Sequence, residues 1–321
     1  MDKQKEVTIQ ELADACGVSI STVSKALRRS ERISADTIRR VEEKAAELGY
    51  VGSQAARALS AKKRRVAVVL PTAMPELCER YRVGCREAAP ILAANGITVT
   101  EVAPEETAGY DGVLLHASMA PLFTPTEGQA VAVVGGRAPA LHPVVEVTPD
   151  TRVGGRLAAQ FLAFATDGSP VAVLSAHRGN YIEDEAVRGF RELSARLGVS
   201  VTAVVECGDS PRNLRTELRR LMMSAPRTRG IFVTAPLAAA AATAAGEMRR
   251  RPTVVGLDFT ASAQEALRAG GVAALLYSGE ERQATTALTA LCEALTAHRT
   301  CGHVDVRQEL VLRSNLENYL N

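Results

Sequence analysis

Tryptophan is absent from this 321-residue sequence, and aromatic residues make up only 4% of it. The apolar fraction is nevertheless 46%, so small and β-branched side chains must fill the interior. Such a composition is typical of α/β proteins. A chain of this length is too long for one ordinary core, which indicates two or three domains.

Targeting segments and paired cysteines are missing as well. The N-terminus, MDKQKEVTIQ, has no apolar signal core, and the Ala-rich run at residues 238–245 is far shorter than the roughly 18 residues that a membrane span needs. We therefore expect a cytoplasmic protein with no membrane contact. The six cysteines form no CxxC pair, which predicts reduced, half-buried thiols.

Motifs of common enzymes are also lacking. VVGGRA and TRVGGRLA do not have GxGxxG spacing, and no GxxxxGK[ST] is present. GDS at 208–210 is similar to a hydrolase nucleophile block, but Ser210 and Pro211 fit the start of a helix better. His298, Cys301 and His303 lack a nearby fourth metal ligand, which favours a surface turn. We expect no catalytic residue, no metal and no cofactor, and a hydrolase stays a remote alternative.

Charge is distributed unevenly along the chain. Residues 1–65 contain 14 Lys and Arg against 9 Asp and Glu, a balance of +5, whereas the remainder has 24 against 27, a balance of −3. A small basic N-terminal unit ahead of a weakly acidic body indicates a polyanion as the partner of the former, although a solvated basic surface would give the same count.

Start and stop signals predict three short helices within residues 7–49. Thr8 begins a capping box, Gly17 supplies a turn, and Ser19 and Ser34 are N-caps of the second and third helices. Apolar residues at spacings of three and four would form one trihelical core. This arrangement is a helix-turn-helix whose second helix carries short polar groups and one cation, suited to base edges and phosphates.

The runs VTIQELADACGVSISTVSKAL, RISADTIRRVEEKAAELGY and AARALS resemble the LacI/GalR transcriptional repressors over residues 7–60. The resemblance implies that the helix from Ser19 lies in the DNA major groove. Lys25 stands where the family usually has arginine, and Arg28 where asparagine is common, so the planar bidentate fork is lost at the first position. The implied DNA-binding residues are Thr8, Ser19, Ile20, Ser21, Thr22, Ser24, Lys25, Arg28, Ser53, Ala56 and Leu59.

A hinge helix follows the third helix in this family. The resemblance implies that Leu59 enters the minor groove as a wedge and kinks the DNA, while Ala55 and Ala56 let two hinge helices approach each other. Gly52-Ser53 replaces the family's Pro-Asn, which keeps a helix cap but loses a stiff connection. The alternative is an ordinary amphipathic linker that ends in the solvated charge run 62–65.

Beyond residue 65, short Val/Ile/Leu runs alternate with amphipathic helices, the pattern of parallel sheets with crossover helices. Helices are expected at residues 77–94, 152–165, 184–197 and 213–223, whereas the stretch 100–111 is too short for a full one. Nine strands are expected, at VAVVLP, ITVTEVA, GVLLHA, AVAVVGG, VAVLSA, VTAVVEC, GIFVTA, TVVGLD and VAALLYS.

With the family resemblance, these elements imply an α/β fold of two Rossmann-like lobes, of the type I periplasmic-binding-protein kind. The chain would cross between the lobes near Ala165, Leu276 and Thr300. The predicted domains are a helix-turn-helix domain at 1–51, a hinge helix with a basic linker at 52–65, and a two-lobed effector-binding and dimerisation domain at 66–321.

An effector would meet the carboxyl ends of the strands. The resemblance assigns sugar-hydroxyl acceptors to Asp150 and Asp258, but Ala186, Ala235-Pro236 and Tyr277 stand where the family has an arginine, Asn-Asp and a glutamine. This loss of polar groups argues against a common sugar pocket. The candidate effector-binding residues are Thr72, His116, Asp150, His177, Arg178, Thr234, Asp258 and Tyr277.

These observations predict a homodimeric repressor that binds a palindromic double-stranded operator and responds to a small polar, sugar-like metabolite. The main alternative is a DNA-binding regulator whose lobes take no small molecule and which is controlled by abundance or by a protein partner.

Overall fold

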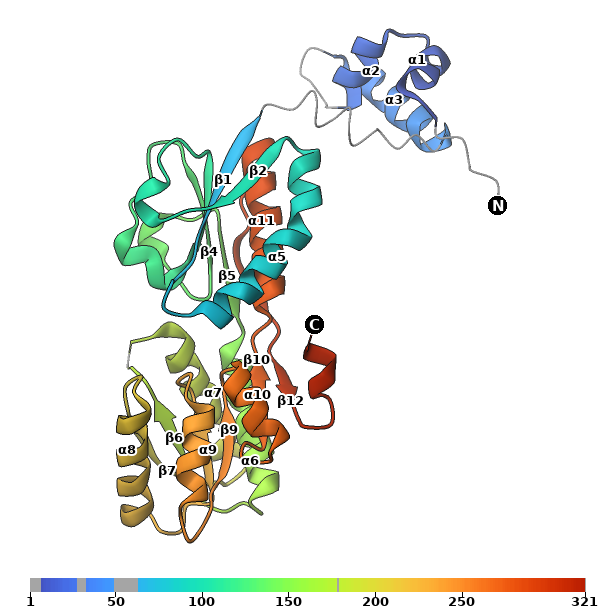
Figure 1. The fold of residues 1–321 in the computed structure, drawn as a ribbon. Coiled ribbons are helices and arrows are strands. Elements are labelled where there is room, and N and C mark those ends of the chain that lie inside the picture. Colours follow the sequence, from blue (N-terminus) through green and yellow to red (C-terminus); the bar gives the residue numbers. More distant parts are fainter. Residues whose placement is uncertain (1–6, 28–32, 49–62, 178, 321) are drawn as a thin grey trace. The chain divides into compact units, whose positions relative to one another are not determined.

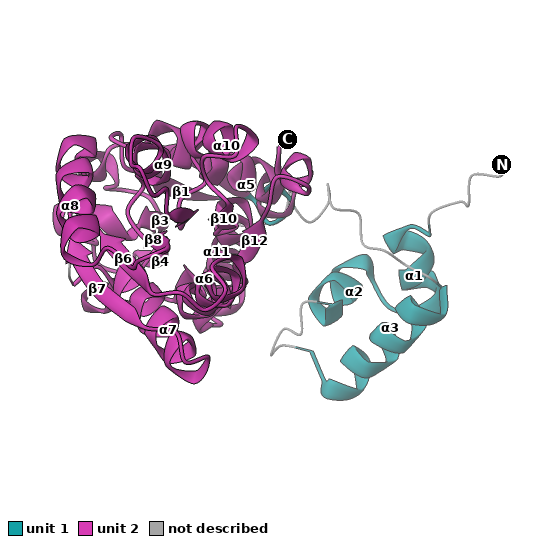
Figure 2. Ribbon diagram, turned by 90° about the horizontal axis from the view of Figure 1, so that it is seen from below, with its two compact units in different colours: residues 1–63, 93–96 teal, residues 64–92, 97–321 magenta. Residues whose placement is uncertain are grey.

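The computed structural model describes residues 7–27, 33–48, 63–177 and 179–320. The chain forms two compact units, residues 1–63 with 93–96 and residues 64–92 with 97–321 (Figure 2). The domain boundary expected between residues 51 and 52, and the hinge helix expected after it, lie outside the described residues.

The first unit contains three helices, α1 (Ile9–Cys16), α2 (Ile20–Leu27) and α3 (Ala35–Leu48). The predicted caps are present. The backbone N–H groups of Glu11, Thr22 and Thr37 each donate to the serine or threonine three residues earlier, at 3.3, 3.1 and 3.3 Å. The helices enclose one apolar core, as the sequence predicts, made of Leu12, Ala13, Cys16, Val23, Ala26, Val41 and Ala45.

The second unit contains two six-stranded sheets (Figure 1). Lobe 1 holds the first sheet, in the order β11-β5-β4-β3-β1-β2, and all of its neighbouring strands are parallel. The strands are β1 (Arg64–Val69), β2 (Ile97–Glu101), β3 (Gly112–His116), β4 (Ala130–Val134), β5 (Val145–Pro149) and β11 (Gly302–Val306).

Helices cover only one face of the lobe 1 sheet. On that face α5 (Pro75–Ala94) and α11 (Glu280–Ala297) share an apolar core with β1, β3, β4 and β5. The opposite face is filled by side chains from connecting segments, among them Tyr110, Phe123 and Ala138. These segments form the short 3-10 helices η1 (Pro104–Glu106), η2 (Ala117–Leu122) and η3 (Pro139–Leu141).

Lobe 2 holds the second sheet, in the order β12-β10-β9-β8-β6-β7, with β12 antiparallel to β10. Its strands are β6 (Val171–Ser175), β7 (Val201–Glu206), β8 (Gly230–Val233), β9 (Thr253–Gly256), β10 (Ala274–Tyr277) and β12 (Glu309–Val311). Helices cover both faces here. One face carries α6 (Thr151–Ala165) and α7 (Tyr181–Arg196), and the other carries α8 (Pro211–Ser224), α9 (Ala238–Gly246) and α10 (Ala261–Arg268).

The chain passes between the lobes at three places. The second crossing follows β10 and lies next to the predicted Leu276. The other two predictions were wrong. The first crossing lies at Asp150, between β5 and α6, because α6 already packs in lobe 2 and Ala165 is its last residue. The third lies at residues 307–308, because β11 pairs with β5 in lobe 1 before the chain reaches β12.

All nine predicted strands and all four predicted helices are present, with ends that shift by a few residues. Between β2 and β3 the chain forms only η1, as expected for a stretch too short for a full helix, and Ser210 and Pro211 are the N-cap and first residue of α8. Three strands were not predicted, β5, β11 and β12. The turn expected at residues 298–303 runs into β11, where His303 pairs with Asp305 at 2.9 Å.

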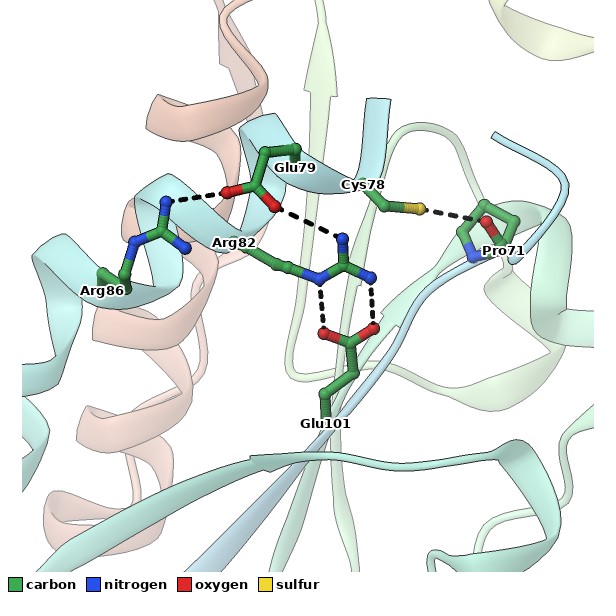
Figure 3. A network of polar contacts seen from close by, with 6 residues as sticks. All are labelled: Pro71, Cys78, Glu79, Arg82, Arg86 and Glu101. Atoms are coloured by element: carbon green, nitrogen blue, oxygen red, sulfur yellow. Dashed lines mark hydrogen bonds and ion pairs between the residues drawn. The ribbon is translucent and has the colours of Figure 1, made fainter. Parts of the chain in front are cut away.

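A polar network fixes α5 against the edge of the lobe 1 sheet (Figure 3). Arg82 donates two hydrogen bonds of 2.7 Å to the carboxylate of Glu101 on β2, and Glu79 binds Arg82 and Arg86 at 3.4 and 2.9 Å. The Arg82 guanidinium lowers the pKa of Glu101. These ion pairs are largely exposed, so they position the helix more than they stabilise it.

Within the described ranges, none of the helices combines the length and the apolar character that a bilayer span requires. All six cysteines are free thiols. Four of them are buried, Cys85 is half-buried and Cys301 is exposed.

Candidate DNA-binding surface and ligand cavity

One face of α2 is exposed and carries the residues predicted to read DNA. Val23 and Ala26 point into the core of the unit, while Ile20, Ser21 and Lys25 are exposed. Ile20 keeps 42% of its surface open although it is apolar, which suits contact with a thymine methyl or another apolar group. The arrangement leaves a short polar helix face with one cation and one apolar side chain.

Of the eight remaining residues that were predicted to bind DNA, the structure describes four. Ser19 and Thr22 form the N-terminal turn of α2, with 2.9 Å between their hydroxyl oxygens, and Ser24 is half-buried. Thr8 is exposed, and its backbone N–H donates to Glu11 at 2.7 Å. The other four lie outside the described residues, namely Arg28, Ser53, Ala56 and Leu59.

Lobes 1 and 2 together enclose a cavity of about 640 Å³. That volume is in the range of small-molecule sites. Its wall combines apolar and aromatic side chains with polar ones, and both lobes contribute. The cavity lies at the carboxyl ends of the strands, where ligands of doubly wound sheets bind.

Three of the predicted effector-binding residues line this cavity. His116 comes from the end of β3 in lobe 1, whereas Thr234 and Asp258 follow β8 and β9 in lobe 2. Ser118, which follows the same strand β3, and Arg137, which follows β4, line it as well. The structure thus brings together side chains that are far apart in the sequence.

Four other predicted residues do not line the cavity. Thr72 is exposed in the turn after β1, and His177 is 60% exposed, with its Nδ1 atom 3.9 Å from Glu206. Asp150 is the N-cap of α6 and accepts a hydrogen bond from the Val153 N–H at 3.1 Å. Tyr277 is buried.

The Tyr277 ring packs against Phe259 and Tyr319. Its hydroxyl donates to Glu281. Arg178 lies outside the described residues.

His116 is held as a neutral imidazole at the cavity wall. Burial lowers its pKa to about 4. The Ser118 N–H donates to Nδ1 at 3.3 Å, which leaves the proton on Nε2. Gly135 has a φ of 69°, and a Cβ there would overlap the imidazole, so glycine is required on both counts.

Two carboxylates in the lobe 2 wall have different environments. Glu183 accepts three hydrogen bonds at its Oε2 atom, from Ser175 Oγ, the Ala176 N–H and Thr234 Oγ1 at 2.7 to 2.9 Å. Asp258 accepts weaker ones from the Ala238 N–H and Thr260 Oγ1, at 3.3 and 3.1 Å. Burial raises the pKa of Asp258 to about 6.

Several lining residues were missed because they lie in the first or second turn of a helix rather than at a strand end. Lobe 1 contributes Arg80 and Tyr81 from α5, and Glu280 and Gln283 from α11. Gln283 is hydrogen-bonded to the Tyr81 hydroxyl at 3.2 Å and to the Gly135 N–H at 3.1 Å. For Glu280 the sequence did contain a signal, because this polar residue lies in the turn that directly follows a predicted strand.

The assignment of this chain comes from its two matched regions. Residues 8–53 match the family "bacterial regulatory proteins, lacI family", and residues 66–299 match the periplasmic binding protein domain. The chain belongs to the LacI family. It is a DNA-binding transcriptional regulator with a helix-turn-helix and a periplasmic-binding-protein-like domain, as the sequence predicted.

Individual LacI-family relatives agree with this assignment. The HTH-type transcriptional regulator GntR of Pseudomonas aeruginosa is 44% identical over 66 residues, which is 20% of this chain and 19% of that protein. CelR of Thermobifida fusca, also an HTH-type transcriptional regulator, is 27% identical over 301 residues, 83% of this chain and 86% of CelR.

The fold of the LacI-family domain also recurs among solved structures. AraP, an arabinose binding protein from Geobacillus stearothermophilus, matches with a TM-score of 0.72 at 18% identity, over 81% of this chain and 100% of that one.

Proposed function

We propose that this regulator is a homodimeric repressor that binds a palindromic operator in the cytoplasm, where the chromosome is. The observation that carries the proposal is the exposed face of α2, which offers Ile20, Ser21 and Lys25 on a rigid, capped helix. Two identical reading heads related by a two-fold axis read two identical half-sites. The roles of Arg28, Ser53, Ala56 and Leu59, including the minor-groove wedge, are part of this proposal and follow from the sequence alone.

The interlobe cavity is the proposed effector site. Its wall offers a neutral imidazole, hydroxyls and a weakly bonded carboxylate, at His116, Thr234 and Asp258, and all of these can bind a small polar molecule. A solved structure of the same fold is an arabinose binding protein, which supports a sugar-like ligand. The size and polarity of the cavity favour a ligand over the alternative of lobes that bind no small molecule.

Effector and operator would be coupled through the arrangement of the lobes. A ligand that contacts both lobes has different affinities for an open and a closed arrangement, and only such a difference can change the affinity for DNA. The sign of the response, induction or co-repression, depends on which arrangement the operator-bound dimer prefers.

The DNA-binding role is tested on an operator selected from random DNA with the full-length protein. In fluorescence anisotropy, Lys25→Ala should weaken binding by about 1 to 3 kcal/mol and relax the base preference at one position. Lys44→Ala is the matched control, because Lys44 on α3 is already paired with Glu47 at 2.9 Å. Wild-type affinity should also fall steeply with salt. If Lys25→Ala selected the same operator consensus as the wild type, the proposal that α2 reads bases through Lys25 would be contradicted.

A further inference from the structure

Glu280 is a buried carboxylate in the cavity wall, and it is incompletely satisfied. It is the first residue of α11, directly after the second crossing, and only 6% of it is exposed. Its Oε2 atom is buried and has no hydrogen-bond partner. A buried carboxylate without a partner is costly, so such a group usually has a ligand or a function.

The described part of the cavity wall has an excess of negative charge. It carries four carboxylates, Glu76, Glu183, Asp258 and Glu280, against the two guanidinium groups of Arg80 and Arg137. Both cations are already neutralised by acids outside the lining. Arg80 pairs with Glu281 at 2.9 Å, and Arg137 pairs with the buried Glu146 at 2.7 Å. The charge of Glu280 is therefore not balanced by a cation of its own.

The groups that surround Glu280 do not remove this imbalance. From α5 it faces Arg80 and Tyr81, from β10 Tyr277, and on its own helix Glu281 and Arg282. Arg282 pairs with Glu309 at 2.7 Å. The N-terminus of α11 supplies roughly half a positive charge. Burial nevertheless dominates and raises the pKa of Glu280 to about 7.

We propose that the effector carries a basic nitrogen and that its ammonium group binds the Glu280 carboxylate, with Asp258 as a second acceptor across the cavity. The ligand class is a small hydroxylated primary amine, for which His116, Thr234 and Gln283 provide hydroxyl partners. This inference rests on the proposed effector site and specifies its chemistry.

An ammonium group fits this position better than a neutral hydroxyl does. Both can donate to Oε2, but only the cation also balances the charge that burial makes unfavourable. In the free protein near neutral pH a proton partly fulfils this role. Binding of the ammonium group would displace that proton, so the ligand would take the place of a hydrogen ion.

The first test compares how tightly the full-length protein binds amines and their neutral hydroxyl analogues. The pairs are D-glucosamine with D-glucose, D-galactosamine with D-galactose, and ethanolamine with ethylene glycol, each tested by thermal shift and then by calorimetric titration. We expect at least one amine to bind at least tenfold more tightly than its hydroxyl analogue. Glu280→Gln should abolish this preference, while Glu293→Gln, an exposed residue on the same helix, should keep it.

A second measurement determines how many protons are released when the amine binds. Titrations of the best amine in two buffers of different ionisation enthalpy should show protons released on binding at pH 6, from Glu280 and in part from Asp258, and fewer protons released as the pH rises towards 8. Glu280→Gln should release markedly less. If neutral sugars bind and amines do not, the inference is wrong although the effector site stands. If neither class binds at 10 mM, both the inference and the proposed effector site fail.

Discussion

Lobes 1 and 2 have the same strand order but are covered differently. In lobe 2, α-helices pack on both faces of the sheet, whereas in lobe 1 the described α-helices, α5 and α11, pack on one face. Tyr110, Phe123 and Ala138, from connecting segments, fill the other face. The sheet order therefore does not depend on a full set of crossover helices. Buried side chains from short loops can substitute for a helix wherever they cover the strands.

The lobes also contribute different chemistry to the cavity. Lobe 1 places charged groups there from the second turn of α5 and the first turn of α11, at Arg80 and Glu280. Lobe 2 places Thr234, Asp258 and Phe259 there from segments that follow its strands. The Phe259 ring belongs to lobe 2, and the Arg80 guanidinium that lies over this ring belongs to lobe 1. A ligand can therefore change the arrangement of the lobes by competing for or completing these contacts.

The largest effect should come from the tightly packed pair of helices α6 and α7 in lobe 2. A Cβ at Gly155 of α6 would overlap the carbonyl oxygen of Ala186 on α7, and backbone cannot move aside as a side chain can. Gly155→Val should lower the free energy of unfolding by about 3 kcal/mol or more. Gly246→Ala on α9, where no atom lies within 4 Å, is the control and should be neutral or stabilising. Urea unfolding of both variants would decide this, and equal midpoints would mean that the close packing is not required.

Stability should depend on pH differently in the two lobes because Glu280 of lobe 1 and Asp258 of lobe 2 both have raised pKa values, to about 7 and about 6. A folded chain that keeps a proton which the unfolded chain has lost becomes less stable as pH rises. For Glu280 this loss falls between about pH 4.5 and 7 and amounts to on the order of 3 kcal/mol.

The difference in unfolding free energy between Glu280→Gln and the wild type should therefore grow by that amount, in favour of the variant, across this window. Asp258→Asn should show a smaller gain that ends near pH 6. The lowered pKa of His116 acts in the opposite direction but cancels when each variant is compared with the wild type. A pH-independent difference for Glu280→Gln would show that this carboxylate is not buried as described.

A smaller effect is expected at the contact that joins the lobes. The Arg80 guanidinium of lobe 1 lies 4.7 Å from the ring centre of Phe259 and 5.4 Å from that of Tyr277, both in lobe 2. Cation–π contacts of this kind contribute about 0.5 to 2 kcal/mol, so Arg80→Met should change the affinity for an effector amine by roughly threefold to thirtyfold. Arg82→Met is the control, because Arg82 on the same helix binds Glu101 within lobe 1 (Figure 3). Calorimetry that finds equal affinities for both variants would contradict a role for this contact.

The smallest effect should be at Asp150. Its carboxylate caps α6 and does not line the cavity, so Asp150→Ala should cost about 1 kcal/mol of stability and leave effector affinity unchanged. Asp150→Ser should restore the cap. A loss of effector binding in Asp150→Ala that Asp150→Ser does not restore would return this residue to the binding site, where the sequence had placed it.

The sequence was sufficient for the elements whose signals are local. Caps at Ser19 and Ser34, nine of the strands and the start of α8 at Pro211 depend on neighbouring residues, and all are present. The edge strands β11 and β12 were missed because a short, half-exposed strand lacks an apolar run and is specified by its partner. Two of the three crossings were misplaced, because a connection does not encode which lobe the next element joins.

The cavity could be predicted only in outline. Strand ends located His116, Thr234 and Asp258, because parallel strands point their carboxyl ends to one side of a sheet. Burial of a charge was not visible in the sequence. Glu280 follows a glycine in an acidic, polar run, a pattern typical of a solvated helix start. In the structure, however, it lies directly after the second crossing and is buried. A polar residue next to a crossing between the lobes is therefore as good a candidate for a binding site as one at a strand end.

The mutual glycine contacts of α6 and α7 have a mechanical consequence. Gly155 faces the Ala186 backbone and Gly189 faces that of Arg152, so the two helices touch without side chains between them and must turn as one rigid body. That body begins at Asp150, where the chain leaves lobe 1, and it carries Tyr181 at the cavity wall. A ligand that draws Tyr181 towards lobe 1 would rotate the whole pair about Asp150. The helix pair would then act as a lever arm, which converts a contact of one side chain into the displacement of an entire face of lobe 2.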